Sequence, residues 1–451
     1  MNKTRYSMKA REIPLDDSWD VVVAGGGPSG CTAAVAAARE GAKTLLIEAT
    51  GSLGGMGTSG LVPAWCPFTD KEKIIYRGLA QRVFEAGREG VAHVAPENLD
   101  WVPIDSERLK RVYDNLVAAS GASVLFHTAL TGVEMEQDGK GNVSALLVAN
   151  KSGLSALRAK VYVDATGDGD LAAWAGAEFE KGEKGTGDLQ PATHCFILAN
   201  VDYYAYRNGP PWVMRGPESV ISRIATSGRY PQILDRHACN NTIGPGCVGF
   251  NAGHLWNVDN TDPASVSKAL VEGRKIAVAF RDALAEFHPK AFGDAYLAAT
   301  GALMGVRETR RIVGDYVLTL EDFLARRSFE DEICRNCYSI DVHHAACEAE
   351  AVRKGTVDPW ARTHHYGKGE SHGIPYRCLT PKGLRNVLVA GRCISSDRPV
   401  QGSVRVMPVC LCTGEAAGVA AAMAAQDGRD VHGVDVAGLR ARLREVGAYL
   451  P

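Results

Sequence analysis

The sequence predicts an α/β fold built on a parallel sheet, and three segments lead to this prediction. Residues 20–48 have the pattern of a strand, a glycine-rich turn, a helix and a second strand. Residues 157–170 read as a strand that ends in a glycine-acid turn, and residues 386–425 as a strand followed by a small-residue helix. Because the third segment lies far from the first, we expect the sheet to be assembled from both ends of the chain.

The first segment fits a dinucleotide-binding βαβ unit. An apolar strand, residues 20–24, runs into the turn Gly25 to Gly30, which matches G-x-G-x-x-G. An alanine-rich helix and a second strand follow, and the second strand ends at Glu48. An acidic residue about 20 positions after the glycines is the spacing expected of this unit. The pattern predicts dinucleotide binding but leaves open which dinucleotide is bound.

Each position of this turn has a physical role. Gly25 permits a tight turn, Gly27 lets the backbone approach a pyrophosphate, and Gly30 lets the helix pack closely on the strands. The helix that starts at Pro28-Ser29 offers free N–H groups and a partial positive charge to the phosphates. Glu48 would accept hydrogen bonds from ribose hydroxyls and would disfavour the additional phosphate of NADP.

Composition narrows the function classes. The chain has 451 residues, of which 45% are hydrophobic and 23% charged, as in ordinary globular enzymes, and two or three domains are expected. A formal net charge of −2 gives no general field for nucleic acid or a membrane surface. We expect no transmembrane helix and no signal peptide. Twelve cysteines without an export signal favour reduced thiols in the cytoplasm.

The chain order indicates a split cofactor domain. Residues 1–176 and 378–451 are predicted to form it, and residues 177–377, where aromatic residues, histidines and prolines are irregularly spaced, to form an inserted domain. Within the insertion, one helix is expected to begin at Pro263, capped by Asp262, and to end before His288. Other expected elements are helices over 74–86, 106–119 and 434–449, a strand over 123–136, a hairpin over 143–163 and a polar loop over 392–407.

A second glycine-rich stretch follows Glu48. Residues 50–60 contain Gly54, Gly55, Met56 and Thr58 within TGSLGGMGTSG. So many glycines predict a backbone held close to a flat or charged group.

Beyond the βαβ unit, the chain resembles the FAD-dependent oxidoreductases related to the fumarate reductase and succinate dehydrogenase flavoproteins. The matching stretches, in the family's order, are VVVAGGGPSGCTAAVAAAREGAKTLLIE, LGGMGTSGLV, VDATGDGDLAAWAG, GVRETRRIVGDYVLTLEDF, GIPYRCLTPKG, NVLVAGRCIS and SVRVMPVCLCTGEAAGVAAAMA. The resemblance implies FAD, a Rossmann-like FAD-binding domain of the two-dinucleotide-fold flavoprotein type, and an inserted α+β substrate domain. The sequence lacks the full set of substrate-binding histidines and arginines of fumarate reductases, which argues against C4-dicarboxylate chemistry.

Carried over by position, the resemblance assigns cofactor contacts along the chain. The predicted cofactor-binding residues are Gly25, Gly27, Pro28, Ser29, Gly30, Glu48, Gly54, Gly55, Met56, Thr58, Thr166, Gly167, Asp168, Gly391, Arg392, Ser403, Val404 and Val406. The helix that begins near Pro408 is expected to aim its N-terminus at the pyrimidine side of the flavin and to stabilise negative charge there.

Catalysis needs a proton donor or acceptor and an anchor for the substrate. His343, His372, His254 and Tyr376 are candidate acid–base groups. Arg405 precedes the small-residue helix and could hold a substrate carboxylate or carbonyl through two N–H groups. A neighbouring set, Arg307, Glu308, Arg310 and Arg311, is expected to form a structural ion-pair network.

The cysteines suggest a rival chemistry. Cys334 and Cys337 form a C-x-x-C pair, with His343, His344 and Cys347 following, and such a set could hold zinc. One pair without a second matching pair is a weak pattern, so no metal is predicted. Cys410, near a helix N-terminus, is read as a packed side chain in preference to a reactive thiolate.

The sequence therefore predicts an FAD-dependent oxidoreductase that transfers a hydride between a small polar metabolite and flavin N5. Two alternatives stay open at this point: a flavin monooxygenase, suggested by the Gly167–Asp170 turn, and a flavin-binding electron-transfer subunit of a larger complex. A dithiol–disulfide reductase using Cys334 and Cys337 is a weaker rival. Expected partners are a small-molecule substrate, with neither nucleic acid nor membrane. The electron donor or acceptor and a homo-oligomeric state are left open.

Overall fold

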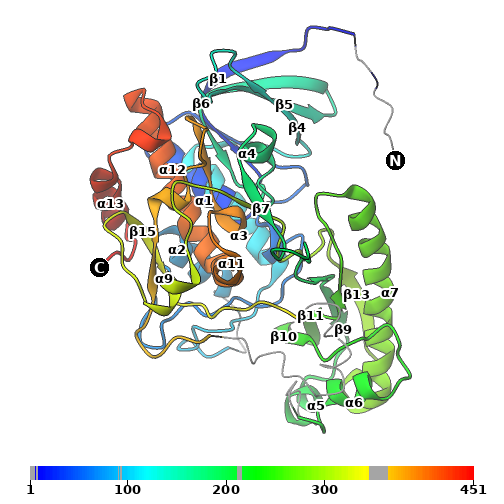
Figure 1. Cartoon of the computed structure of the whole chain (residues 1–451). Coiled ribbons are helices and arrows are strands. Elements are labelled where there is room, and N and C mark those ends of the chain that lie inside the picture. Colours follow the sequence, from blue (N-terminus) through cyan, green and yellow to red (C-terminus); the bar gives the residue numbers. More distant parts are fainter. Residues whose placement is uncertain (1–5, 7–8, 90, 92–93, 211–215, 345–363) are drawn as a thin grey trace.

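The computed structural model describes residues 6, 9–89, 91, 94–210, 216–344 and 364–451. Two bodies of packed structure are visible (Figure 1): a larger one around a mixed sheet and a smaller one beside the long helix α7. Each has its own hydrophobic core.

The larger body is built on a sheet with the strand order β3-β2-β1-β6-β5-β4, with β17 pairing with β6 outside this path. Its strands β1, β2, β3, β6 and β17 run parallel, whereas β4, β5 and β6 are joined in antiparallel pairs. The bounds are β1 (Leu15–Ala24), β2 (Thr44–Ile47), β3 (Ser123–Leu125), β4 (Ala129–Met135), β5 (Val143–Asn150), β6 (Gly153–Asp164) and β17 (Val387–Val389). Because β17 comes from the C-terminal part, the sheet is assembled from both ends of the chain, as predicted.

Two helices cross this sheet side by side in Figure 1: α1 (Pro28–Arg39) and α12 (Met407–Asp427). Glycines let them approach closely, since a Cβ on Gly414 would lie 2.1 Å from the Ser29 carbonyl oxygen, and one on Gly418 2.2 Å from that of Ala33. By length and composition α12 is apolar enough to cross a membrane, but 94% of its apolar window is buried inside the protein. It is therefore the core helix of this body.

The smaller body packs helices on a four-stranded antiparallel sheet with the order β10-β11-β9-β13. Stacked Phe196 and Phe250 of the sheet meet Phe280 of α7 in its core. Asp262 caps α7 through the N–H of Ala264 and Pro263 occupies its first turn, as predicted. The bounds are β9 (Phe196–Ala199), α5 (Tyr203–Asn208), α6 (Val220–Thr226), β10 (Ala238–Gly244), β11 (Cys247–Ala252), α7 (Pro263–Phe287), α8 (Pro289–Phe292) and β13 (Tyr296–Thr300).

The remaining elements connect the two bodies or cover the larger one. Three of these are two-stranded sheets, formed by β7 and β14, by β8 and β12, and by β15 and β16. Apolar residues such as Ile312, Phe323 and Ile374 belong to the core of the larger body, although the sequence placed them in the insertion. The bounds are α2 (Leu79–Arg88), α3 (Ser106–Ser120), α4 (Asp170–Trp174), β7 (Phe179–Lys181), β8 (Ala192–Thr193), β12 (His254–Leu255), β14 (Arg310–Ile312), α9 (Leu320–Leu324), β15 (Glu332–Asn336), β16 (His372–Pro375), α11 (Arg398–Val404) and α13 (Val436–Glu445), with short 3₁₀ turns η1 (Gly55–Gly57), η3 (Tyr376–Cys378), η4 (Gly391–Cys393) and η5 (Val431–Gly433).

Several predicted elements need correction. The expected strand over 123–136 is two strands, β3 and β4, separated by a break. The helix expected from residue 74 begins at Leu79, because Ile74 pairs with Thr69 in a β-bridge. The expected polar loop over 392–407 contains α11, which Asp397 caps through the N–H of Val400. A capping side chain followed by Pro399 was the signal for this helix.

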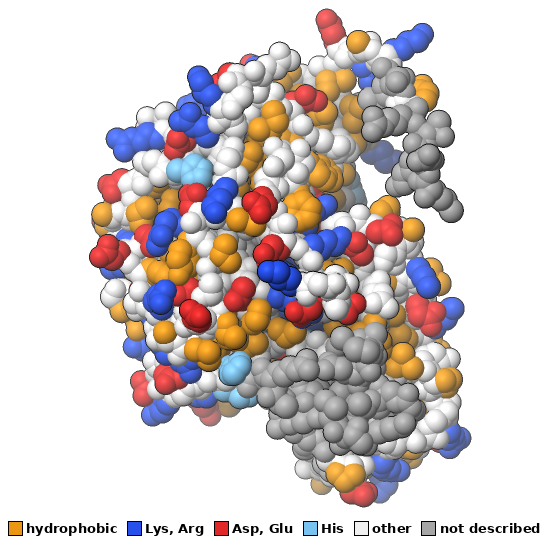
Figure 2. Space-filling model, viewed as in Figure 1, with side chains coloured by type: hydrophobic (Ala, Val, Ile, Leu, Met, Phe, Trp, Pro, Cys, Tyr) orange, Lys and Arg blue, Asp and Glu red, His pale blue; other side chains and the backbone are white. Residues whose placement is uncertain are grey.

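On the face shown in Figure 2, basic and acidic side chains are interspersed.

Candidate active site

The glycine turn after β1 is shaped for a ligand that approaches its backbone. Gly25 has φ +97°, and a Cβ on it would lie 2.6 Å from the carbonyl oxygen of Ala165. A Cβ on Gly30 would lie 1.7 Å from the carbonyl oxygen of Gly25, so α1 packs directly on the turn. A Cβ on Gly27, in contrast, would meet no atom of the described residues within 4 Å. The turn is therefore closed on its protein side and open above Gly27.

Glu48 and the second glycine loop lie against this turn. Glu48 accepts the N–H of Gly26 through Oε2 at 2.7 Å and the N–H of Thr50 through Oε1 at 2.7 Å. Gly54 donates its N–H to the carbonyl oxygen of Gly26 at 2.8 Å. A Cβ on Gly55 would lie 3.1 Å from Cα of Gly27. The two glycine-rich segments thus form one wall.

The same wall reaches the start of α12. A Cβ on Gly57 would lie 3.1 Å from the Sδ of Met407, the first residue of this helix. No side chain of the described residues caps the N-terminus of α1 or of α12, so their first N–H groups remain available as donors. Met56 lies in this loop, and Thr58 donates from Oγ1 to the carbonyl oxygen of Leu53 at 2.6 Å, which fixes the loop.

Two further predicted segments flank α1. Gly391 has φ +83°, and a Cβ on it would lie 2.5 Å from the Oγ of Ser29. Asp168 accepts hydrogen bonds through Oδ1 from Thr309 at 2.6 Å and from Arg392 at 2.7 Å, and through Oδ2 from Asn260. Asp168 therefore joins the two bodies, and its predicted contact with a cofactor stays a prediction.

Thr166, Gly167 and Ser403 are held by protein groups. Thr166 donates from Oγ1 to Asp164 at 2.7 Å, and burial raises the pKa of Asp164 to about 6. A Cβ on Gly167 would lie 3.0 Å from the guanidinium of Arg392. Ser403 donates to the carbonyl oxygen of Tyr338 and accepts from Asn336 at 2.7 Å. Val404 and Val406 are buried beside it.

A dense polar cluster lies where the smaller body meets residues 338–344. We call it the histidine cluster. His254 lies between Asp235, 2.5 Å from Nδ1 to Oδ2, and His343, 2.8 Å from Nε2 to Nδ1. The ring of His237 stacks on that of His254 at 4.2 Å. The members are Asp235, His237, His254, Arg307, Asp341, His343, His344 and Arg405.

Arginines and carboxylates surround these rings. Arg307 donates from Nη2 to Nε2 of His237 at 3.1 Å. Burial lowers the pKa of the Arg307 guanidinium to about 10. Nε2 of His343 lies 3.4 Å from Oδ1 of Asp341, and Arg405 donates from Nη2 to Oδ2 of Asp341 at 3.1 Å. Burial opposes ionisation of Asp341, but His343, Arg405 and Arg307 hold its pKa well below the usual range.

Three histidines of the cluster, His237, His254 and His343, have lowered pKa values and are neutral at pH 7. Burial, followed by the charge of Arg307, lowers the pKa of His343 to about 3. Burial also lowers the pKa of His254, against the opposing effect of Asp235, and lowers that of His237 well below the usual range. Burial would raise the pKa of Asp235, but His254 and His344 hold it well below the usual value. The cluster thus combines ionised carboxylates with neutral imidazoles.

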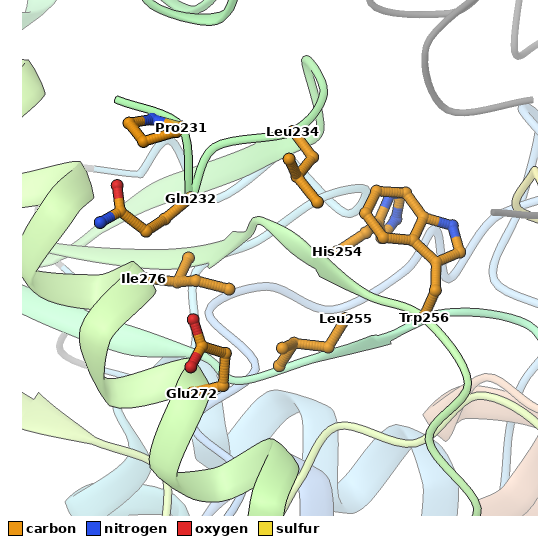
Figure 3. Close-up of a pocket in the computed structure, with 8 residues that line it drawn as sticks. All are labelled: Pro231, Gln232, Leu234, His254, Leu255, Trp256, Glu272 and Ile276. Carbon is orange, nitrogen blue, oxygen red and sulfur yellow. The ribbon is translucent and has the colours of Figure 1, made fainter. Parts of the chain in front are cut away.

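A cavity of about 410 Å³ in the smaller body reaches the cluster at His254. Figure 3 shows Trp256 beside His254 at one end, and Glu272 and Ile276 of α7 at the other. Leu234 and the loop before it form the opposite side in Figure 3. The cavity is mainly apolar and brings one ring of the buried cluster to its wall.

The family to which the chain belongs indicates which cofactor binds beside these glycine-rich segments. A family model described as FAD dependent oxidoreductase matches residues 20–443. The chain belongs to the FAD dependent oxidoreductase family. It is an enzyme of this class, and FAD is its cofactor. The open space over Gly27, the uncapped N-termini of α1 and α12 and the adjoining glycine loop fit a pyrophosphate and a flavin.

Comparisons with individual proteins give more distant similarities. Digeranylgeranylglycerophospholipid reductase of Thermoplasma volcanium is 28% identical over 170 residues, which are 36% of this chain and 42% of the reductase. Dihydrolipoyl dehydrogenase of Trypanosoma brucei brucei is 50% identical over 48 residues, 11% of this chain and 10% of that enzyme. The chain spans less than half of the length of these curated relatives.

Similar solved structures include a geranylgeranyl bacteriochlorophyll reductase-like protein from Thermoplasma acidophilum, with 15% identity and a TM-score of 0.46 over 96% of this chain and 83% of that chain. Another is p-nitrophenol 4-monooxygenase from Pseudomonas putida, with 11% identity and a TM-score of 0.41 over 96% of this chain and 81% of that chain.

The structure brings some predicted catalytic residues of this FAD enzyme together and separates others. Arg405 and His343 lie on either side of Asp341, and His254 contacts His343. His372 is fully buried and bonds through Nδ1 to the hydroxyl of Tyr366. Tyr376 donates its hydroxyl to the carbonyl oxygen of Val431 at 2.7 Å, and both roles stay predictions.

Sequence reasoning missed Asp235, His237 and Asp341. Asp235 and His237 lie about 20 residues before His254 in the loop that precedes β10, which has no motif, so no spacing rule points to them. Arg307 was expected in an ion-pair network, but it contacts His237. Glu308 does pair with Arg311 at 2.7 Å and with Arg398 at 3.1 Å.

The cysteine pair does not meet the histidines proposed as its zinc partners. Cys334 is buried, and Cys337 bonds through Sγ to the carbonyl oxygen of Thr69 at 3.2 Å. His343 and His344 contact Asp341 and Asp235. Cys347 lies outside the described residues. Burial raises the pKa of Cys410 to about 12, which agrees with the packed side chain expected there.

The histidine cluster contains a group of possible metal ligands. A carboxylate oxygen of Asp235, a ring nitrogen of His254 and a ring nitrogen of His344 all lie within 4.8 Å of one another.

Proposed function

We propose that this FAD-dependent oxidoreductase transfers a hydride between a small polar metabolite and flavin N5, beside the start of α12 and the histidine cluster. FAD, when bound, supplies the two-electron chemistry. The observation that carries the proposal is the group Arg405, Asp341 and His343, which combines a cation, a carboxylate and a neutral imidazole. Arg405 lies two residues before Met407, the first residue of α12.

Each residue of this group has a proposed task. Arg405 binds a carboxylate or carbonyl oxygen of the substrate, since its side chain is 12% exposed and its Nε has no hydrogen-bond partner among the described residues. His343 exchanges a proton with the substrate, because it enters the reaction neutral. The N–H groups at the start of α12 stabilise negative charge that develops beside them.

The proposal also covers the protein's more distant relatives, its location and its partners. We propose a more distant relationship with the fumarate reductase and succinate dehydrogenase flavoproteins, supported by the order of the matching stretches. We also propose a cytoplasmic location with reduced thiols, supported by the free cysteines of the described chain. The substrate is a soluble small molecule in this proposal, without a nucleic-acid or membrane partner, and self-association is left to measurement.

The experiment follows the flavin absorbance of the purified holoenzyme under anaerobic conditions. Hydroxy acids, sugars and amines are added one at a time, and we expect one class to bleach the flavin band. Bleaching by NAD(P)H alone, followed by oxygen consumption with an aromatic substrate, would favour a monooxygenase. Bleaching by a dye or partner protein, without bleaching by any metabolite, would favour an electron-transfer subunit. Either result would overturn the proposal.

A further inference from the structure

Three side chains of the histidine cluster, Asp235, His254 and His344, bring metal-binding atoms to one place. Nδ1 of His254 lies 2.5 Å from Oδ2 of Asp235, and Nε2 of His344 lies 3.2 Å from the same oxygen. The exposed fractions of the three residues are 1%, 4% and 8%, so the group is shielded from bulk water. Two imidazoles and one carboxylate form a ligand set that suits zinc and ferrous iron.

The contact between His344 and Asp235 has the length expected for two ligands of one ion. Nε2 of His344 is buried and makes no hydrogen bond of normal geometry to Asp235 or to any other described residue. Ligand atoms that lie 2.0–2.2 Å from a tetrahedral zinc ion are about 3.3 Å apart. The contact between Asp235 and His254 is shorter, and it opens by about 0.8 Å when an ion replaces the hydrogen between the two atoms.

His343 and Asp341 lie where a metal-bound His254 needs its second shell. A neutral imidazole that binds an ion through Nδ1 carries its proton on Nε2. Nε2 of His254 lies 2.8 Å from Nδ1 of His343, and Nε2 of His343 faces Oδ1 of Asp341 at 3.4 Å. Metal-binding histidines almost always donate their other N–H to such a neighbour, which fixes the orientation of the ring. The structure therefore supplies the contacts behind the ligands as well as the ligands.

The charges and the cavity indicate what the fourth position of the ion would take. Asp235 offsets one of the two positive charges of a divalent ion. The Arg307 guanidinium adds positive charge nearby, since it donates to His237, whose ring stacks on that of His254 at 4.2 Å. An anion in the fourth position balances this excess. The cavity of about 410 Å³ reaches His254 beside Trp256 (Figure 3) and offers a small anion a route to the ion.

We propose that Asp235, His254 and His344 bind a divalent transition-metal ion, zinc or ferrous iron, whose fourth position takes an anionic oxygen of a small molecule, a carboxylate or a hydroxide. None of the three residues has a task in the proposed function, so this inference does not rest on it. The ion would join the loop before β10, the start of β12 and the segment after β15 at a single point.

Calorimetric titration of the purified holoenzyme tests the site. Bound metal is first removed with a chelator, and ZnCl₂, or ferrous chloride without oxygen, is then added. We expect one of the two ions to bind at one equivalent per chain and to raise the melting temperature, because the ion binds only the folded protein. Magnesium in excess should not compete, since it prefers oxygen ligands. A wild-type holoenzyme that binds neither ion overturns the inference.

Variants locate the ion. Asp235→Asn and His344→Gln each remove one ligand, and the dissociation constant should rise by roughly 100-fold or more, the upper end of the loss for a second-shell partner. FAD content and circular dichroism verify that both variants fold. Asp315→Asn is the matched control and should bind the ion normally, because Asp315 holds Nδ1 of His432 at 2.6 Å elsewhere in the protein. Unchanged binding in both ligand variants overturns the inference.

Two further measurements separate this site from its rivals. The double variant Cys334→Ser, Cys337→Ser should keep the ion, and loss of the ion from this variant would place it at the cysteine pair and overturn the inference. Co²⁺ replaces zinc as a spectroscopic probe, and its visible bands beyond the flavin absorption should shift when acetate is added. Bands that acetate leaves unchanged in the Co²⁺-loaded protein would show a closed site and overturn the open fourth position.

Discussion

Arg405 donates from Nη2 to Asp341 twice, to the carbonyl oxygen at 2.8 Å and to Oδ2 at 3.1 Å. These bonds hold Arg405, the C-cap residue of α11, against the segment that carries His343. Arg405 lies two residues before the start of α12 at Met407. One edge of the guanidinium is therefore held in place by protein, and the buried Nε, which has no partner within the described part of the chain, is left for another oxygen. A substrate anchor needs this combination of fixed position and available donor.

Arg405→Lys should leave the FAD content and flavin spectrum normal but lower turnover roughly 10- to 100-fold. Lysine keeps the charge and loses the planar fork, which removes a charge-assisted contact of about 1.5–3 kcal/mol. Occupancy and rate per bound flavin are measured on one sample. Arg377→Lys is the control, because Arg377 forms a similar fork with Asp331 on the surface. An unchanged rate per flavin in Arg405→Lys excludes the anchoring role.

Gly27→Val and Gly30→Ala should fail in different ways. Gly27 has φ −71°, and a Cβ there would meet nothing within 4 Å in the part of the chain that the structure describes. The Gly27→Val protein should therefore fold, and its side chain should block the pyrophosphate. A methyl group on Gly30 would lie 1.7 Å from the carbonyl oxygen of Gly25 and should prevent packing of α1. Circular dichroism and the flavin spectrum distinguish a folded, colourless protein from an unfolded one. Full FAD retention by Gly27→Val would contradict this assignment.

Replacing Cys334 and Cys337 by serine should leave the rate per bound flavin close to that of the wild type. Burial raises the pKa of both thiols, that of Cys337 to about 12, so neither supplies a thiolate near pH 7. Cys334 packs in the core, so a buried hydroxyl there should lower the melting temperature. Loss of activity with FAD retained, or one zinc ion per chain in the wild type that the double variant lacks, would show that the pair has a chemical role.

The elements that the sequence predicted well are those with local signals. Capping by Asp262, the glycine turn and the long apolar runs depend on neighbours within a few residues, and the structure confirms them. The break between β3 and β4 was missed because residues 126–128, Phe-His-Thr, contain no glycine or proline to mark a turn, although His127 has a positive φ of +49°. α11 was missed because its polar residues lack a helical apolar stripe, although Asp397 and Pro399 are a start signal.

The histidine cluster shows why the site was only half predictable. His254 and His343 were candidates as single residues, but nothing in the sequence relates positions that are 89 residues apart. Their contact depends on how β12 meets the segment after β15, a tertiary arrangement. Tyr376 was a candidate because it lies in a stretch that resembles the family, and His372 because it immediately precedes this stretch. The structure places both side chains in the core of the larger body, bonded to Tyr366 and to Val431.

The burial of His372 predicts how stability depends on pH. Burial, followed by the charge of Arg335, lowers the pKa of His372 from 6.5 to about 3 in the folded protein. Between these values the unfolded chain binds the proton and the folded protein does not. The stabilising contribution is therefore fully present above pH 6.5 and is lost as the pH falls through this window toward 3.

His372→Gln should accordingly make unfolding less sensitive to acid. Between pH 7.5 and pH 5.0 this residue should lower the free energy of unfolding of the wild type by about 2 kcal/mol. pH 5.0 lies about 1.5 units below the pKa of histidine in the unfolded chain, and each unit corresponds to about 1.36 kcal/mol. Urea unfolding at both pH values gives the difference for each protein, so any general cost of the substitution cancels. His432→Gln, at a partly exposed histidine, controls for the loss of an imidazole. The same acid-induced loss in His372→Gln and the wild type would mean that His372 is protonated in the folded protein at pH 5.0, and the neutral, buried imidazole would then be wrong.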